Sequence, residues 1–144
     1  MQNDKPLKES RLQVESDLNA VPEVLQWFEQ FTSPNLPQQF CGECQLALVE
    51  GFTNAVRHAH HHLPLTTPIE LELELFSQYL EMRVWDHGQP FDWQAKLKAL
   101  CSEDVDPLEK EGGRGLMFMN QLTDELSYVR FTDDRNCLLM RKRR

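Results

Sequence analysis

Apolar residues in the first half of this chain recur every three or four positions, which is the spacing of an α-helix. Two stretches show this spacing, residues 21–31 and residues 40–58, and two prolines separate them. The apolar positions are Val21, Val24, Leu25, Phe28 and Phe31 in the first stretch and Cys44, Leu48, Phe52 and Ala55 in the second. Each set would form one stripe along its helix, so we expect two amphipathic helices that share a core.

Strict alternation of apolar and polar residues predicts two strands. The first covers residues 11–16, and the second covers residues 69–75, where Ile and Leu alternate with Glu70, Glu72 and Glu74. This ladder of glutamates predicts a sheet with one buried face and one wet, acidic face. Solvation is the simpler interpretation of the acidic face, and a docking surface for a partner is the alternative.

Three further strands and two shorter helices follow. The strands are expected at residues 79–85, 126–132 and 137–141, and the helices at residues 92–100 and 116–122. The acidic segment 101–111 has no periodicity and is expected to be a loop. The order of elements predicts an α+β fold, a two-layer α/β sandwich with helices on one face of a mixed, mostly antiparallel sheet. We expect residues 1–10 to be a flexible leader and residues 11–144 to form one domain.

Charge and apolar content limit the possible partners. The 144 residues include 15 lysines and arginines against 23 aspartates and glutamates, a formal net charge of −8. Phosphodiester backbones repel such a chain, so direct nucleic-acid binding is not expected. No apolar run reaches the ~20 residues of a membrane span, and no signal core follows the polar first ten residues. We therefore expect a cytoplasmic protein without membrane contact, whose cysteines stay reduced.

The first of three short motifs places Glu50 and Asn54 four residues apart, on one face of the second helix. The amide oxygen of Asn54 suits Mg²⁺, whose other ligands would be phosphate oxygens and water. Glu50 could accept a proton from a hydroxyl or water that attacks a γ-phosphate. When this motif is taken alone, an ordinary pair of polar surface residues is the favoured explanation, because such pairs are common on exposed helices.

The second motif begins at the end of a predicted strand, where Asp86 could accept the exocyclic amine of adenine. Two residues later, Gly88 would let the backbone pass close to the base. The third motif exposes glycine N–H groups ahead of a helix, as phosphate sites do, and consists of Gly112, Gly113, Arg114, Gly115 and Leu116. Its arginine could meet the β- or γ-phosphate. A plain turn and a linker are the separate alternatives, but together the three motifs predict a site for ATP and Mg²⁺.

In order and spacing, the motifs resemble the nucleotide-binding fold of sensor histidine kinases, type II topoisomerases and MutL. The resemblance is closer to the bacterial anti-sigma-factor serine/threonine kinases of the RsbW and SpoIIAB type. It covers residues 10 to 142 and rests on the runs 48–59, 86–92, 112–116 and 122–125.

The resemblance implies a role for each motif. Glu50 would be the general base, Asn54 would ligate Mg²⁺, and Asp86 would bind adenine. Gly88 would line the base pocket, and the loop from Gly112 to Gly115 would close on the phosphates. Relatives carry a Gly-Thr pair in the last hairpin, whose Thr helps to hold adenine. This chain departs from that pattern with Asp134-Arg135-Asn136-Cys137, and Thr132 is the candidate substitute.

The same resemblance implies an ATP- and Mg²⁺-dependent serine/threonine protein kinase that phosphorylates a serine on a STAS-type anti-anti-sigma partner. It also implies a possible homodimer that sequesters a sigma factor. The alternative is a nucleotide-gated binding module that holds a sigma factor or STAS protein without effective phosphotransfer. The catalytic module of a histidine kinase is less favoured, because no helix with a phosphoacceptor histidine precedes the predicted fold.

Two clusters have simpler explanations than a metal or redox site. The histidines at the end of the second helix could bind Zn²⁺ or Ni²⁺, and they are His58, His60, His61 and His62. We favour a polar helix end, since no carboxylate or cysteine partner lies near them in sequence. Cys41 and Cys44 form a CxxC pair, for which we favour thiols packed as small apolar groups.

Overall fold

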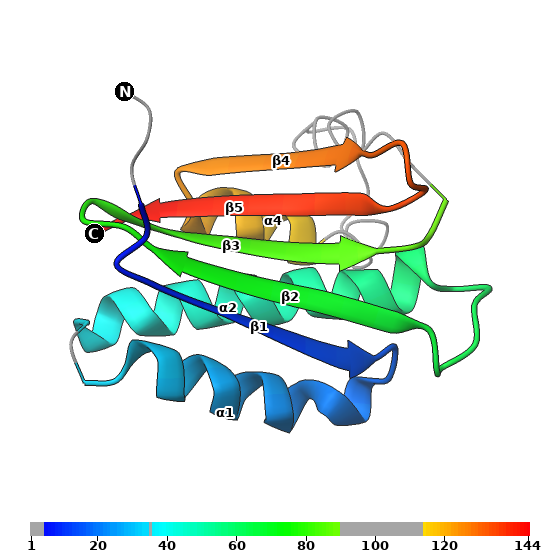
Figure 1. Cartoon of the computed structure of the whole chain (residues 1–144), viewed down its shortest axis with the longest axis horizontal. Helices are drawn as coiled ribbons and strands as arrows, with labels where there is room; N and C mark the ends of the chain where they lie inside the picture. Colours follow the sequence, from blue (N-terminus) through cyan, green and yellow to red (C-terminus); the bar gives the residue numbers. More distant parts are fainter. Residues whose placement is uncertain (1–4, 35, 90–113) are drawn as a thin grey trace.

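The structure is a computed structural model that describes residues 5–34, 36–89 and 114–144. Five strands of the described chain form one sheet in the order β1-β2-β3-β5-β4, and each neighbouring pair is antiparallel. Their bounds are β1 Lys8–Glu15, β2 Pro68–Leu75, β3 Tyr79–Asp86, β4 Glu125–Arg130 and β5 Asn136–Arg143. The helices α1 Val21–Thr32, α2 Gln38–Asn54 and α4 Arg114–Leu122 cover one face of this sheet (Figure 1).

The predicted two-layer α/β sandwich is therefore confirmed, with every described strand pair antiparallel. The link at Ser77–Gln78 joins β2 to β3, and the predicted closing hairpin is formed by β4 and β5. The helix expected at residues 92–100 and the loop expected at residues 101–111 lie outside the described residues. Within the described chain, no helix is both long enough and apolar enough to cross a membrane.

The expected boundary of the leader at residue 10 is wrong, because β1 already begins at Lys8. Lys8 pairs with Leu75 in the sheet, and its Nζ donates a hydrogen bond to the carbonyl of Phe31 at 2.8 Å. Ser10 accepts a hydrogen bond from Nε1 of Trp27 on α1 at 2.9 Å. The polar residues at the start of β1 therefore take part in the fold through partners that lie far away in sequence.

The two apolar helix stripes predicted from the sequence meet the sheet in one core. Val24, Phe28 and Phe31 of α1 are buried. The apolar stripe predicted for the second helix is buried as well, at Cys44, Leu48, Phe52 and Ala55. Against them lie the apolar positions of β2, Ile69, Leu71, Leu73 and Leu75, all of which are buried. The alternation along β2 thus turns its aliphatic side chains toward the helices and its glutamates toward the opposite face.

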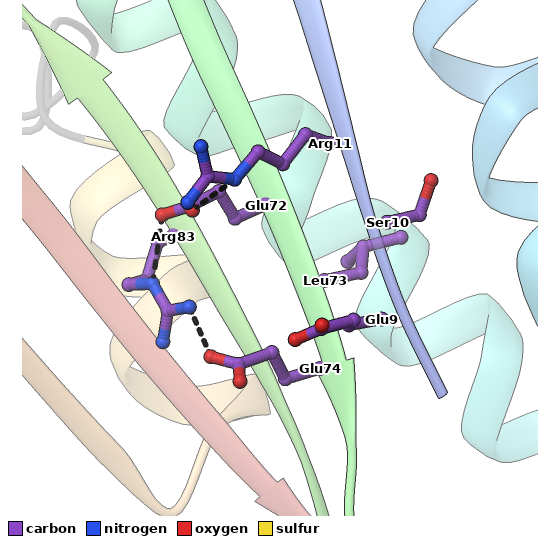
Figure 2. A pocket seen from close by; sticks show the side chains of 7 residues that line it. All are labelled: Glu9, Ser10, Arg11, Glu72, Leu73, Glu74 and Arg83. Atoms are coloured by element: carbon purple, nitrogen blue, oxygen red, sulfur yellow. Dashed lines mark hydrogen bonds and ion pairs between the residues drawn. The ribbon is translucent and has the colours of Figure 1, made fainter. Parts of the chain in front are cut away.

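The glutamate face is charged, but the expectation that it is simply wet is wrong at Glu72, which is only 8% exposed. Arg83, from the neighbouring β3, lies between the carboxylates of Glu72, Glu74 and Glu81 and forms ion pairs with all three. Arg11 reaches Glu72 from the other side at 2.9 Å (Figure 2). Long side chains from adjacent strands therefore cover one another and remove part of this face from water.

These ion pairs form much of the wall of an open hollow of about 390 Å³ on the sheet, drawn in Figure 2. Nε1 of Trp85 donates a further hydrogen bond to Glu72 at 2.5 Å. Burial acts to raise the pKa of Glu72, but the hydrogen bonds from Trp85 and Arg83 outweigh it, and the pKa is lowered. Glu72 is therefore held as a carboxylate by its partners.

Replacing Arg83 with Met keeps an apolar stem and leaves two nearly buried carboxylates without their shared cation. We expect Arg83→Met to lower the free energy of unfolding by about 3 kcal/mol near neutral pH. Arg11→Met is the matched control, because Arg11 is largely exposed and its loss should cost less than about 1 kcal/mol. Urea unfolding measures both, and equal effects of the two substitutions would contradict the role given to Arg83.

The lowered pKa of Glu72 also fixes the direction of a pH effect. Its pairing contributes stability above the ordinary glutamate pKa of 4.5, and that stability is lost as the pH falls through the lower pKa of the folded state. Arg83→Met should therefore lose less stability than the unmodified chain when the pH is lowered below 4.5. Urea unfolding at a series of acid pH values checks this difference.

Candidate functional site

The second sequence motif lies where β3 ends, and its carboxylate is buried. Asp86 is the last residue of β3 and is only 3% exposed. Its Oδ1 accepts hydrogen bonds from the backbone N–H of Gly88 at 2.9 Å and from Nδ2 of Asn136 at 2.8 Å. Its Oδ2 accepts from the hydroxyl of Tyr128 at 3.2 Å. No ion pair among the described residues includes Asp86, so neutral donors hold this carboxylate.

Among the described residues, the donors to the Asp86 carboxylate leave one acceptor position on Oδ2 without a partner. Burial raises the pKa of Tyr128, and the negative charge of Asp86 adds to this effect, so the Tyr128 hydroxyl keeps its proton and donates. A carboxylate oxygen can accept about two hydrogen bonds. Tyr128 is the one donor to Oδ2 within the described part of the chain. The carboxylate can therefore accept one further N–H from a ligand.

The residue opposite Asp86 in the sheet completes this network. The register of β3 and β5 pairs Asp86 with Asn136, which is fully buried. Nδ2 of Asn136 also donates to the carbonyl of Gly88 at 2.9 Å, and Nη1 of Arg130 donates to the same carbonyl at 2.9 Å. In the last hairpin it is thus Asn136 that donates to Asp86, whereas the expected substitute Thr132 lies exposed in the turn.

The first motif lies at the end of α2. Glu50 and Asn54 are half-exposed and share a face of this helix, as their spacing predicts. Between them, Gly51 lets the helix approach the sheet closely. A Cβ atom at Gly51 would lie 3.1 Å from Cδ2 of Leu138 and 3.2 Å from Cε of Met140. This close packing on β5 fixes the position of the helix turn that carries both polar side chains.

Directly after Asn54 the helix widens into a π-helical turn, Ala55–Ala59, which we call the π-turn. The N–H of His60 donates to the carbonyl of Ala55 at 2.8 Å, five residues back. The extra residue turns His60 onto the buried side of the helix, where it is only 2% exposed. Such π-turns occur frequently at functional sites.

The π-turn that follows the first motif meets the second motif through its backbone. A Cβ atom on Gly88 would lie 2.0 Å from the carbonyl oxygen of Ala59, so the two chain segments are in direct contact. Beside this contact, Nε2 of His60 accepts the backbone N–H of His87 at 2.8 Å. None of the described glycines has a positive φ, so Gly88 is required here for space. The end of the π-turn and the Asp86–Gly88 turn are therefore held together.

The third motif is only partly within the described residues. Gly112 and Gly113 lie outside them, while Arg114, Gly115 and Leu116 form the first turn of α4. This agrees with a glycine-rich segment that leads into a helix. Further along α4, Met119 is fully buried, and the helix packs beside α2. Contacts of this motif with Asn54 or Asp86 stay a prediction.

Among the described residues, no group of three or more histidine, cysteine, aspartate or glutamate side chains is arranged so that it could hold one metal ion. His60 points into the protein, and His61 and His62 are exposed. Cys44 is buried, and burial raises the pKa of its thiol to about 12. It therefore packs as a neutral apolar group, as the sequence predicts.

Residues 14–142 match the family of histidine kinase-like ATPase domains, which agrees with the sheet, the helix-borne polar pair and the buried strand-end carboxylate described above. The chain belongs to this family. The resemblance to the nucleotide-binding fold predicted from the three motifs is thus confirmed at the level of the domain.

Curated relatives of this histidine kinase-like ATPase domain carry the name Serine-protein kinase RsbW. The protein from Staphylococcus epidermidis is 33% identical over 89 residues, which cover 59% of this chain and 55% of the relative. Those from Bacillus licheniformis and Bacillus subtilis are 38% and 35% identical over 88 residues, or 58% of this chain and 54% of each relative. The chain therefore spans about half the length of the curated relatives it matches.

A solved structure supports the same fold. The crystal structure of the RsbU and RsbW domains of a Mycobacterium tuberculosis protein matches with a TM-score of 0.68 and 16% sequence identity. The match covers 96% of this chain and 32% of that chain. It shows that nearly all of this histidine kinase-like ATPase domain follows a known arrangement of strands and helices.

Sequence reasoning missed several residues that contact the Asp86–Gly88 turn. Tyr128, Asn136 and Arg130 surround the Asp86–Gly88 turn, yet they lie more than forty positions away in sequence. The register between β3 and β5 brings them there, and nothing local in the sequence fixes that register. The sequence favours a polar helix end at His60, with a metal site as the alternative, because a regular helical period does not place this residue in the core.

A methyl group at Gly88 has no space in this ATPase domain. We expect Gly88→Ala to displace the Asp86–Gly88 turn from the π-turn and to lower the free energy of unfolding by about 1–3 kcal/mol. Gly42→Ala is the matched control, since a Cβ atom at this exposed helix position meets nothing within 4 Å and should stabilise by up to about 1 kcal/mol. Thermal unfolding followed by circular dichroism compares the two, and a Gly88→Ala variant as stable as the unmodified chain would refute the contact.

Proposed function

We propose that this chain is a serine/threonine protein kinase that transfers the γ-phosphoryl group of ATP to a serine of a STAS-type anti-anti-sigma partner. The family assignment supports ATP as the nucleotide, and the curated relatives are named serine-protein kinases. A homodimer that sequesters a sigma factor is a further proposal, and it rests on the likeness to RsbW alone.

The observation that carries the proposal is the buried carboxylate of Asp86. A carboxylate removed from water is costly unless donors satisfy it, and here Gly88, Asn136 and Tyr128 do so without neutralising its charge. The open acceptor position on Oδ2 fits the exocyclic amine of adenine. Guanine carries a carbonyl oxygen at the equivalent ring position, which would face a carboxylate without a proton between them. The site should therefore bind ATP in preference to GTP.

The phosphate half of the site is proposed from the first and third motifs. Asn54 supplies an amide oxygen of the type that Mg²⁺ accepts together with phosphate oxygens. When bound, Mg²⁺ would offset negative charge on the β- and γ-phosphates. The N–H groups of Gly112, Gly113 and Gly115 and the guanidinium of Arg114 would provide further donors to the phosphates.

Glu50 is proposed to accept the proton of the substrate serine. As the serine oxygen forms its bond to the γ-phosphorus, the bond from that phosphorus to the β,γ-bridging oxygen breaks and ADP leaves. The hydroxyl proton passes to the carboxylate of Glu50. Its place on α2, one helical turn before Asn54, would put it on the same side as the phosphates.

Asp86→Asn tests the base-binding half of the site. The substitution keeps the size of the side chain but replaces one acceptor oxygen with an amide donor, which cannot accept the adenine amine and crowds the donors around it. We expect ATP binding to become undetectable by isothermal titration calorimetry, while the unmodified chain binds ATP more tightly than GTP. Unchanged ATP affinity in Asp86→Asn would remove Asp86 from the site.

Glu50→Gln tests the proposed general base. It keeps the shape of the side chain and removes the basic oxygen, so ATP affinity should stay near that of the unmodified chain. Transfer to a partner serine should slow by roughly 10²–10⁴-fold. Single-turnover assays with labelled ATP measure this rate, and near-normal transfer would show that Glu50 does not act as the base.

The alternative, a nucleotide-gated binding module, predicts a different outcome in the same assay. Incubation of the unmodified chain with labelled ATP, Mg²⁺ and a STAS protein encoded near it in the genome should give phosphoserine on the partner. Tight binding of nucleotide and partner without any transfer would favour the module over the kinase.

A further inference from the structure

We propose that His60 is a positioning residue for nucleotide binding, whose neutral imidazole fastens the Asp86–Gly88 turn to the end of the π-turn and releases it on protonation. This inference rests on the nucleotide site proposed above. It adds a residue outside the three motifs and a pH dependence of nucleotide binding.

The position of His60 connects two parts of that site. On one side, His60 follows the π-turn that continues the helix of Glu50 and Asn54. On the other side, its Nε2 accepts the N–H of His87, which lies between Asp86 and Gly88. The side chain of His60 therefore forms a hydrogen bond between the helix end and the backbone of the Asp86–Gly88 turn.

This hydrogen bond requires a neutral ring. A backbone N–H only donates, so Nε2 of His60 must present a lone pair, and the ring proton must then be on Nδ1. Nδ1 is buried and has no hydrogen-bond partner among the described residues. A protonated imidazole would carry N–H groups at both positions, and the one at Nε2 would point at the N–H of His87. Protonation must therefore break the hydrogen bond or move the turn.

The surroundings of His60 favour the neutral form. Burial lowers its pKa from the ordinary value, and this effect outweighs the opposing attraction of the Asp86 carboxylate. His87, whose ring centroid lies 6.2 Å from that of His60, lowers the pKa slightly further. His61 and His62, on the same segment, are exposed. The Asp86 carboxylate would favour a charged ring, and the neighbouring His87 would disfavour it. The backbone N–H of His87 points at Nε2 of His60, so this hydrogen bond selects the neutral imidazole.

The direction of the pH effect follows from these observations. Above the ordinary histidine pKa of 6.5 the ring is neutral and the turn is fastened. As the pH falls through the lower pKa of the folded state, His60 takes up a proton, the hydrogen bond is lost, and Asp86 loses its fixed position. Nucleotide affinity should therefore decrease on acidification, and it should be fully present at neutral pH.

Two amide substitutions test whether His60 acts through its hydrogen bond to His87 or only by occupying space in the core. His60→Gln places an amide oxygen near the position of Nε2, so it can accept from His87 without titrating. His60→Asn reaches only the position of Nδ1 and cannot. At neutral pH we expect His60→Gln to bind ATP within about twofold of the unmodified chain and His60→Asn to bind about tenfold more weakly. Thermal unfolding of each variant shows whether it is folded.

The decisive measurement compares the ATP affinities of the unmodified chain and of His60→Gln. Their ratio is followed from about pH 8 to about pH 5.5, the range in which histidines titrate. Protonation of the nucleotide phosphates and of the other histidines affects both proteins and cancels in the ratio. We expect the unmodified chain to lose affinity relative to His60→Gln as the pH falls. A ratio that does not change with pH would overturn the proposal.

A measurement without nucleotide distinguishes failure of this proposal from failure of the proposed function. In the unmodified chain without ligand, the backbone amide resonances of His87 and Gly88 should shift with the same midpoint as the ring resonances of His60 in a pH titration followed by NMR. Amides that do not follow the ring would refute the proposed link, whatever the nucleotide results. Amides that follow it, in a chain that binds no ATP, would retain the link and reject the nucleotide site.

Discussion

The carboxylate of Asp86 is almost entirely removed from water, and much of the surrounding chain is arranged to hold it in place by hydrogen bonds. Three separate segments supply its donors: the turn that follows it, the start of β5 and the tyrosine of β4. A buried carboxylate with such partners costs little, whereas one without them would take up a proton or turn toward solvent. The order of strands β3, β5 and β4 in the sheet is therefore a requirement of the site as well as of the core.

The carboxylates on the glutamate face of the sheet and the carboxylate at the end of β3 have different partners. On the open face, glutamates of β2 and β3 share Arg83 and other arginines, so their charges are balanced by neighbours. At the end of β3, Asp86 is balanced by no cation of the described chain and is held by neutral donors alone. The first arrangement stabilises the sheet and leaves little free charge for a ligand. The second leaves the carboxylate without a counter-charge among the described residues, as the proposed recognition of a base amine requires.

The elements and the buried stripes could be predicted from the sequence because they depend on local periodicity. Val24 and Phe28, or Leu71 and Leu73, are buried by the same geometry wherever a helix or strand of that pattern meets a core. The motifs at Glu50 to Asn54 and at Asp86 to Gly88 could be found for a similar reason, since each is a short run of residues. Their assignment to one nucleotide site remains a proposal, and local spacing does not give the contacts between them.

What could not be predicted depends on register and on a change of helical period. Asn136 reaches Asp86 because β5 pairs with β3 at that residue, and Glu72 is buried beneath side chains of the neighbouring strands, among them Arg83, which is its partner in the register of β2 and β3. His60 is the clearest case. A regular α-helix continued from Ala55 would bring Ala59 onto the buried side, but the bond from His60 to Ala55 inserts one residue and brings His60 there instead. The π-turn thus places a titratable ring where a regular helix would place a methyl group, and the proposed link from the Asp86–Gly88 turn to the helix end depends on that ring.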